Sequence, residues 1–228
     1  MAQQLILDLH PAPPPSLDNF VVGRNAAALD ALRQCERGRA IYLWGPNGVG
    51  RSHLLQAVSA SHEGYFHSAG SDPESLHRIA TADTLNLPLV AVDDVQLLDA
   101  AGQAALFALY NRWRESAATR QAFALILAGD RSPMAMEVRE DLRTRLGWDL
   151  VFRLEQLSDA ERAEALCRRA AQRGLELSPD VISWLLTHHD RDMSRLTALV
   201  DALDRYSLAR HRAITLPLLK DLLASSQP

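Results

Sequence analysis

The sequence has 228 residues, and 24 Lys and Arg against 28 Asp and Glu leave a formal net charge of −4 at pH 7. Hydrophobic residues make up 47% of the chain, an ordinary share for a globular protein that buries its own core. Nucleic-acid-binding domains usually carry a basic excess, so direct binding to a DNA duplex is not expected. The length fits one medium domain and one small domain.

The two cysteines, Cys35 and Cys167, lie far apart in the sequence and form no Cys-x-x-Cys spacing. Neither a disulfide framework nor a zinc site is therefore indicated. No apolar run approaches the roughly 20 residues that cross a bilayer, and the amino terminus lacks the pattern of a signal peptide. We therefore expect a cytoplasmic protein with no membrane contact.

The first sixteen residues differ in composition from the rest of the chain. Residues 4–9 form a short apolar hexapeptide, and a proline-rich stretch over residues 10–15 follows it. Proline fixes φ and removes backbone donors, so this stretch favours a semi-rigid polyproline II spacer. The hexapeptide is predicted either to fold back onto the domain or to dock in a partner's groove.

Strand and helix patterns alternate over the next part of the sequence. Helices are predicted over residues 25–37, 51–61, 73–81, 101–117 and 138–146. Strands are predicted over residues 40–44, 65–67, 87–92, 122–128 and 149–154. Such alternation favours right-handed crossovers and a parallel sheet covered by helices on both faces. Residues 17–157 are therefore predicted to form an α/β domain.

After Leu157 only helical patterns remain. Ser158 and Glu161 form a capping box that opens a helix ending at Gly174. Pro179 opens a second helix, and further helices are predicted over residues 192–210 and 216–223. Residues 158–228 are therefore expected to form a small all-α domain.

A glycine-rich segment lies between the first predicted strand and the second predicted helix. Its pattern is G-x-x-x-x-G-[KR]-[ST], which in this setting indicates a phosphate-binding loop. Glycines allow successive backbone N–H groups to point at phosphate oxygens, and the helix amino terminus adds a favourable dipole. The segment predicts nucleotide contacts from Gly45, Pro46, Asn47, Gly48, Val49, Gly50, Arg51, Ser52 and His53.

Position 51 is an arginine, whereas this motif usually has a lysine that reaches the β- and γ-phosphates. Arginine keeps the positive charge, but its planar guanidinium is bulkier than an ammonium group and does not replace it. We therefore expect nucleotide binding to survive and the geometry for hydrolysis to be impaired.

One predicted buried strand ends in two carboxylates, Asp93 and Asp94. This end of a strand is where open α/β sheets bind ligands. Asp93 can hold Mg²⁺ together with the hydroxyl of Ser52, and Asp94 can orient or deprotonate an attacking water. Because Asp94 is present, hydrolysis by this chain alone stays open despite Arg51.

Together with the helical segment that follows, these motifs resemble the AAA+ P-loop ATPases of the bacterial replication-initiator family, DnaA. The resemblance covers about residues 17–216, and its supporting segments are residues 17–23, 93–96, 126–131, 143–148 and 212–215. No counterpart of the initiators' carboxyl-terminal DNA-binding domain is expected. The hexapeptide is similar to the Q-L-x-L-x-L peptide that docks on the β sliding clamp of DNA polymerase III. This combination resembles the Hda family of DnaA-related regulatory inactivators.

The resemblance implies roles for further residues. Arg145 matches an arginine finger that acts in trans on a neighbouring subunit's nucleotide, although from the residues alone it also fits a solvated basic helix face. Asp130 occupies a sensor position, and Val21 and Val22 lie in the nucleotide-binding segment. The lid's nucleotide-sensing arginine falls on Ser194 in an ungapped match, with Arg195 directly after it. The expected clamp contacts are Gln4, Leu5, Leu7 and Leu9.

The function implied is negative regulation of chromosomal replication initiation. The chain would hold ADP or ATP with Mg²⁺, stimulate ATP hydrolysis by DnaA, and reach DNA only through the sliding clamp. Homo-oligomerisation stays open. Two alternatives remain: an autonomous ATPase of the helicase-loader type, which predicts turnover by the chain alone, and an adaptor that binds nucleotide but promotes no hydrolysis.

Overall fold

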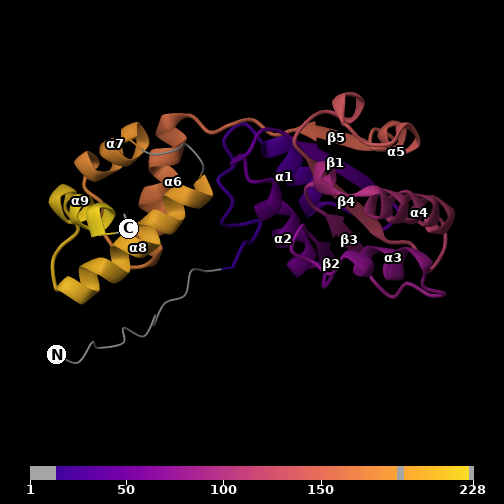
Figure 1. Cartoon of the computed structure of the whole chain (residues 1–228), viewed down its shortest axis with the longest axis horizontal. Coiled ribbons are helices and arrows are strands. Elements are labelled where there is room, and N and C mark those ends of the chain that lie inside the picture. Colours follow the sequence, from indigo (N-terminus) through magenta and orange to yellow (C-terminus); the bar gives the residue numbers. More distant parts are fainter. Residues whose placement is uncertain (1–13, 189–192, 226–228) are drawn as a thin grey trace. The chain divides into compact units, whose positions relative to one another are not determined.

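The computed structural model describes residues 14–188 and 193–225, with the side chains of Ser194 and Ser225 excepted (Figure 1). The expected clamp contacts Gln4, Leu5, Leu7 and Leu9 lie outside these residues. The described residues form two compact units, an α/β unit over Pro14–Gln156 and a helical unit that begins at Leu157.

The α/β unit alternates strands and helices throughout its length. In chain order its elements are α1 (Ala26–Arg33), β1 (Ala40–Trp44), α2 (Arg51–Ser61), β2 (Tyr65–His67), α3 (Pro73–Thr81), β3 (Leu89–Val92), the 3₁₀ turn η1 (Val95–Leu97), α4 (Ala100–Ser116), β4 (Ala124–Gly129), the 3₁₀ turn η2 (Pro133–Ala135), α5 (Glu140–Arg145) and β5 (Leu150–Arg153). The five strands form one sheet in the order β2-β3-β4-β1-β5, and every neighbouring pair is parallel. The predicted fold class is confirmed.

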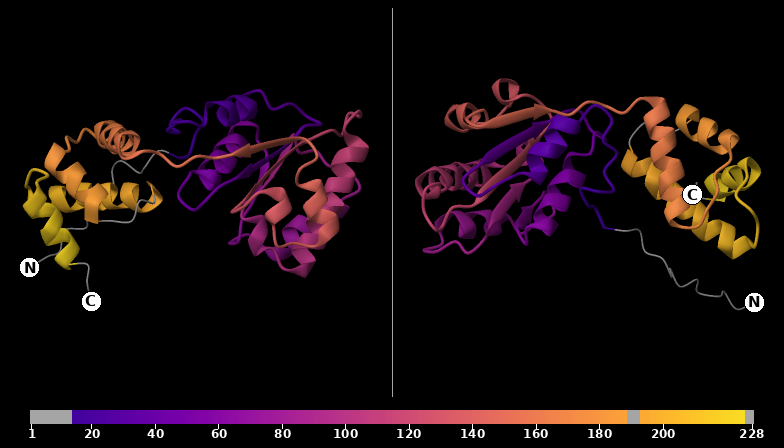
Figure 2. Two further views of the ribbon diagram at one scale, coloured as in Figure 1. Left: turned by 90° about the horizontal axis from the view of Figure 1, so that it is seen from above. Right: turned by 180° about the vertical axis from the view of Figure 1, so that it is seen from behind.

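The three central strands are buried on both faces because helices cover each side of the sheet (Figure 2). Alternate residues of a strand point to opposite faces. Tyr42 accordingly packs with α3, α4 and α5 in one apolar cluster, whereas Ile41 and Leu43 pack with α1 and α2 in the other. This double burial explains why β1, β3 and β4 read as continuous apolar runs.

The first helix is shorter than the sequence predicts. It ends at Arg33 instead of Arg37, and the Gln34 N–H closes it by donating to the Asp30 carbonyl at 3.0 Å. The Gly38 N–H donates to the Phe123 carbonyl at 3.0 Å, just before β4. Residues 35–39 therefore form a turn, because a contact with a distant segment outweighs local helix propensity.

The helical unit contains α6 (Asp159–Gln172), α7 (Pro179–His188), α8 (Met193–Arg210) and α9 (Leu216–Ser225). The capping box is formed as predicted: the Ser158 hydroxyl accepts from the Glu161 N–H, and the Glu161 carboxylate accepts from the Ser158 N–H at 2.6 Å. Leucines and valines from all four helices form its apolar core. No helix in the described part of the chain is long and apolar enough to cross a membrane.

A glycine at the carboxyl end of β4 gives a test of this packing. A Cβ at Gly129 would overlap the Tyr42 hydroxyl and the Met136 methyl, and Tyr42 donates to the Arg131 carbonyl at 2.8 Å. We expect Gly129→Ala to lower the free energy of unfolding by about 1–3 kcal/mol in urea titrations. The control Gly70→Ala places its Cβ in open space and should change stability by less than about 0.5 kcal/mol. A Gly129→Ala variant as stable as the parent protein would contradict this packing.

Candidate functional site

The glycine-rich loop leaves the carboxyl end of β1 and enters α2, as the sequence predicts. Gly50 has a φ of +94°, and a Cβ there would lie 2.6 Å from the Phe20 ring. A Cβ at Gly45 would lie 2.7 Å from the Leu154 carbonyl oxygen. The loop is thus enclosed by Phe20 on one side and by the chain after β5 on the other. Only glycine fits these two close approaches.

Arg51 is buried, with 7% of its surface exposed, and its guanidinium folds back onto the loop. Its Nη1 donates to the Gly45 carbonyl at 2.8 Å, and its Nη2 donates to the Asn47 side-chain oxygen at 3.0 Å. The same Nη2 lies 3.3 Å from a carboxylate oxygen of Asp94. Arg51 therefore stabilises the loop internally instead of extending away from it as the motif's lysine does.

Asp93 is the more buried of the two carboxylates, with 3% of its surface exposed. Burial raises the pKa of Asp93, and hydrogen bonds from the Ser52 hydroxyl and the Asp94 N–H oppose this rise. Its own N–H donates to the His67 carbonyl at 2.9 Å, which connects the end of β3 to the end of β2. The structure thus brings Ser52 and Asp93 together, and a hydroxyl beside a carboxylate suits Mg²⁺.

Asp94 belongs to a chain of polar contacts along the edge of the sheet. Its Oδ1 accepts from Gln96 Nε2 at 2.8 Å as well as from Arg51. Gln96 Oε1 in turn accepts from the Asp130 N–H at 3.2 Å. The Asp130 carboxylate pairs with Arg131 at 3.2 Å. Gln96 therefore links Asp94 to Asp130, the predicted sensor residue, a contact that the sequence analysis missed.

The segment that precedes α1 packs beside the loop. Val21 and Val22 are half-buried, and Val22 lies against the apolar cluster that contains Phe20 and Val49. The His53 ring lies 5.7 Å from the Phe20 ring, and its Nε2 is 3.0 Å from the Ser16 carbonyl oxygen. Val22, one of the residues predicted to contact nucleotide, thus shares an apolar cluster with Val49 of the phosphate loop.

Arg145, the last residue of α5, is half-buried against α4. Its guanidinium stacks 3.7 Å from the centre of the Phe107 ring and 4.9 Å from that of Trp148. It also donates to the side-chain oxygen of Asn111. The Arg145 guanidinium is therefore held by two aromatic rings and an amide, and its role as an arginine finger stays a prediction.

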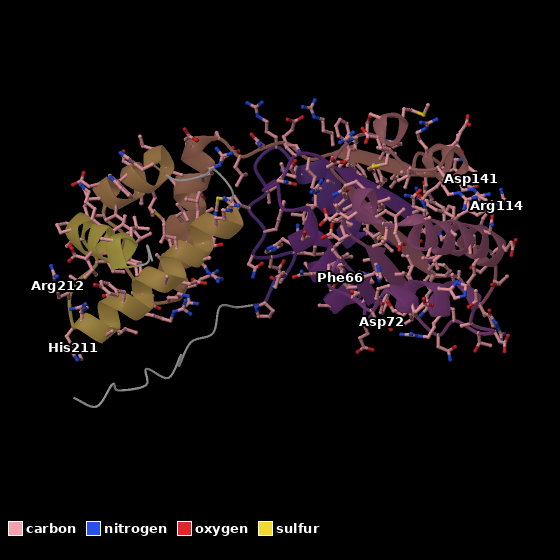
Figure 3. The ribbon with its side chains drawn as sticks, in the orientation of Figure 1. Phe66, Asp72, Arg114, Asp141, His211 and Arg212 are labelled. Carbon is pink, nitrogen blue, oxygen red and sulfur yellow. The ribbon has the colours of Figure 1, made fainter. Side chains whose placement is uncertain are left out.

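The pKa of Arg145 is lowered, first by burial and then by the positive charge of Arg114. Asp141 acts in the opposite direction, and Arg114 and Asp141 are both labelled in Figure 3. Arg114 stacks over the same Trp148 at 5.3 Å. Two cationic side chains and one aromatic ring thus lie together at this end of α4.

The lid residues of the predicted site belong to the helical unit. The Arg195 side chain is exposed on α8, and the Ser194 side chain lies outside the described set. A contact between Arg195 and the phosphate loop stays a prediction.

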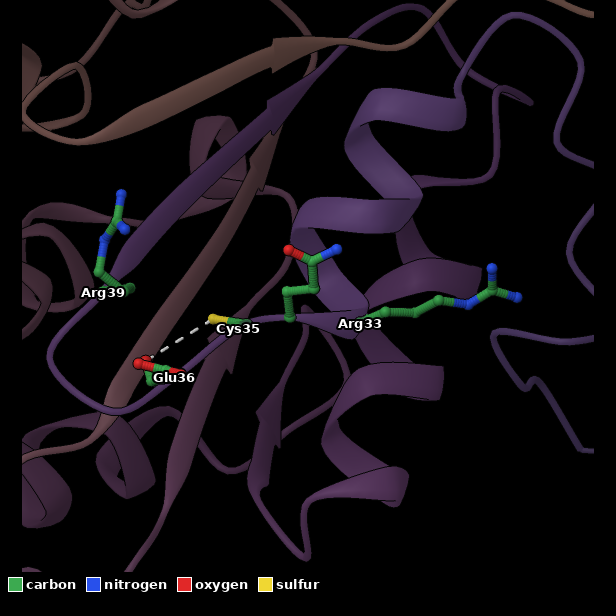
Figure 4. Close-up of a pocket in the computed structure, with 5 residues that line it drawn as sticks. Arg33, Cys35, Glu36 and Arg39 are labelled. Carbon is green, nitrogen blue, oxygen red and sulfur yellow. Dashed lines mark hydrogen bonds between the residues drawn. The ribbon is translucent and has the colours of Figure 1, made fainter.

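A surface pocket lies away from these residues, at the amino-terminal end of β1 (Figure 4). Its lining residues are Arg33, Gln34, Cys35, Glu36 and Arg39. Both arginines have partners, because Arg33 pairs with Asp18 and Arg39 pairs with Asp149 at 2.7 Å. The phosphate loop follows the opposite end of the same strand, so this pocket is not part of the candidate site.

Comparisons with solved structures identify the fold of the whole chain. Domain III of the replication initiator DnaA from Thermotoga maritima aligns with a TM-score of 0.72 and 22% identity, over 95% of this chain and 98% of that one. DnaA from Aquifex aeolicus bound to AMPPCP aligns with a TM-score of 0.65 and 23% identity, over 87% of this chain and 67% of that one. A RuvB variant from Thermotoga maritima aligns with a TM-score of 0.70 and 18% identity, over 95% of this chain and 73% of that one.

With its parallel sheet, glycine-rich loop and helical unit, the chain has the AAA+ P-loop fold that DnaA domain III and RuvB share. Residues 159–223 match the family model described as Hda, lid domain. Over these residues the chain is thus similar to the Hda lid domain, and its fold is similar to that of DnaA domain III. The family match lies in the helical unit, and the α/β unit shares its fold with DnaA.

The pocket cysteine provides a chemical test of the burial described here. Burial raises the pKa of the Cys35 thiol to about 11, whereas Cys167 is exposed. Only the thiolate is alkylated, so at pH 8 Cys35 should react with iodoacetamide about 100-fold more slowly than an ordinary thiol. Mass spectrometry should find label on Cys167 alone in the native protein and on both cysteines in urea. Comparable labelling of both in the native protein would contradict the burial.

Proposed function

We propose that this protein is a negative regulator of chromosomal replication initiation that stimulates ATP hydrolysis by DnaA in trans. It binds ADP or ATP with Mg²⁺ at the phosphate loop and inserts Arg145 as an arginine finger at the nucleotide of DnaA. A peptide containing Gln4, Leu5, Leu7 and Leu9 tethers it to the β sliding clamp of DNA polymerase III. The match to the Hda lid domain and the shared fold with DnaA support this proposal.

The observation that carries the proposal is the position of Arg145. Its guanidinium is held by Phe107, Trp148 and Asn111, so little conformational entropy would be lost when it reaches a partner's phosphate. During hydrolysis water attacks the γ-phosphorus, the bond to the β-phosphate oxygen breaks, and ADP and phosphate leave. A guanidinium beside the γ-phosphate stabilises the charge that develops in this step.

The contacts of the chain's own site favour nucleotide retention over turnover. Asp94 would activate water in an efficient ATPase, but here it pairs with Arg51 and Gln96. Ser52 and Asp93 lie close enough together to share a hydrogen bond, so they suit a nucleotide-bound Mg²⁺. The bound nucleotide would then order the chain while catalysis takes place in the partner.

Clamp binding supplies proximity in this proposal. Residues 4–9 are similar to a clamp-docking peptide, and the prolines in residues 10–15 would act as a spacer. A tether of this kind raises effective concentration, so even a weak peptide contact strengthens the encounter with DnaA. DNA would be reached only through the clamp, which fits the net charge of −4. Homo-oligomers are not required.

An autonomous ATPase of the helicase-loader type is the second candidate. The presence of Asp94 beside the phosphate loop favours it, because an acidic residue there can activate water. It predicts substantial turnover by the chain alone and no need for residues 4–9.

The central experiment measures phosphate release from radiolabelled ATP bound to DnaA, with clamp loaded on DNA. We expect Arg145→Ala to reduce the stimulation about 10³-fold or more, because the transition-state charge loses its guanidinium. Deletion of residues 4–9 should abolish the dependence on clamp. The control Arg120→Ala removes one positive charge from the exposed loop after α4 and should stimulate like the parent. Full stimulation by Arg145→Ala would exclude the arginine finger and favour an adaptor.

A second experiment concerns the chain's own site. We expect slow ATP turnover by the parent and a rate about tenfold or more higher for Arg51→Lys, because the lysine would reach the phosphates and release Asp94. Adding Asp94→Asn to Arg51→Lys should remove the gain. Steady-state turnover by the chain alone gives the readout. A parent rate as high as that of Arg51→Lys would support the autonomous ATPase instead.

A further inference from the structure

Asn25 occupies the position directly before α1, where an asparagine side chain usually accepts a hydrogen bond from the first turn of the helix. Here its side chain makes no such bond, although only 3% of the residue is exposed. Instead, Asn25 Nδ2 donates to the Glu155 carbonyl at 3.1 Å, and the Glu155 N–H donates to Asn25 Oδ1 at 2.7 Å. The carboxamide thus pairs with one backbone residue in the way that a neighbouring strand would.

Glu155 lies where the chain leaves the α/β unit. The preceding residue, Leu154, continues the pairing with β1, since its N–H donates to the Trp44 carbonyl at 2.7 Å. The Leu154 carbonyl oxygen packs directly against Gly45, the first residue of the phosphate loop. One residue after Glu155 the α/β unit ends, and the helical unit begins at Leu157.

The backbone of Asn25 belongs to the segment that precedes α1. Its N–H donates to the Val22 carbonyl at 2.8 Å. Val22 packs in the same apolar cluster as Phe20, and the Phe20 ring packs against Gly50 of the phosphate loop. Asn25 therefore contacts both the segment that contains Val22 and the backbone at the end of the α/β unit.

We propose that Asn25 is a positioning residue that couples nucleotide binding to the peptide at Glu155. A base bound against Val21 and Val22 steadies the turn that contains Asn25, and the carboxamide transmits this order to the backbone just before Leu157. This inference rests on the nucleotide binding of the proposed function. It adds a route by which an occupied site changes the segment that leads to the helical unit.

The Glu155 N–H reports directly on this contact, because its hydrogen-bond acceptor is Asn25 Oδ1. We expect ADP to slow hydrogen exchange at Glu155 in the parent about tenfold or more, as measured by NMR on the full chain. In Asn25→Ala the exchange should be fast and should not respond to ADP, because the buried N–H has lost its acceptor.

Two further variants separate this role from general stability. Asn25→Asp keeps an acceptor for the Glu155 N–H but loses the donor to its carbonyl. It should lower affinity for ADP about tenfold while changing affinity for inorganic pyrophosphate less than twofold, since pyrophosphate lacks the base. The control Asn19→Ala removes a side chain that bonds the Ser16 N–H and the Pro14 carbonyl, and it should keep the parent's response.

The outcomes distinguish the coupling from nucleotide binding itself. If ADP binds the parent without slowing exchange at Glu155, the coupling is overturned and the proposed function stands. Equal losses of ADP and pyrophosphate affinity in Asn25→Asp would also overturn the coupling. A parent that binds no ADP would overturn both. Thermal unfolding identifies variants that fail to fold. If Asn25→Ala fails to fold, the ADP and pyrophosphate affinities of Asn25→Asp test the coupling.

Discussion

The buried guanidinium of Arg51 is the constraint on which the candidate site depends. A buried charge is costly unless it is paired and hydrogen-bonded, and here the loop itself supplies two of the acceptors. The third partner is Asp94, so the positive charge of the loop and the negative charge at the end of β3 compensate each other. Through Gln96 this arrangement extends to the end of β4. One arginine in place of lysine thereby organises three segments at the edge of the sheet.

Local patterns predicted much of the fold because the sheet is buried on both faces. The bounds of β1, α2, β2 and α3 agree with the sequence analysis, since each element has an apolar run or a helix start that needs no distant partner. The first helix was predicted four residues too long, because the Gly38 N–H pairs with Phe123 in a distant part of the chain. Such a contact leaves no local signal.

The same distinction applies to the candidate site. The loop residues and Asp93 are contiguous motifs, so the sequence places them together at the carboxyl ends of β1 and β3. Gln96 lies 34 residues from its partner Asp130, and Asn111 lies 34 residues from its partner Arg145. Asn25 lies 130 residues from Glu155. Each is an amide that pairs with a distant group, and asparagine or glutamine in a sequence more often indicates a turn or a surface position. These contacts become visible only once the chain is folded.

Arg51 and Arg145 differ in what compensates their charge. Arg51 faces a carboxylate, which neutralises it inside the chain's own site. Arg145 instead faces two aromatic rings and a neutral amide, and no carboxylate among the described residues forms an ion pair with it. Aromatic faces hold a guanidinium in place without cancelling its charge. A cation held in this way remains available to an external phosphate, which supports the proposal that Arg145 acts on a partner's nucleotide while Arg51 stabilises the chain's own loop.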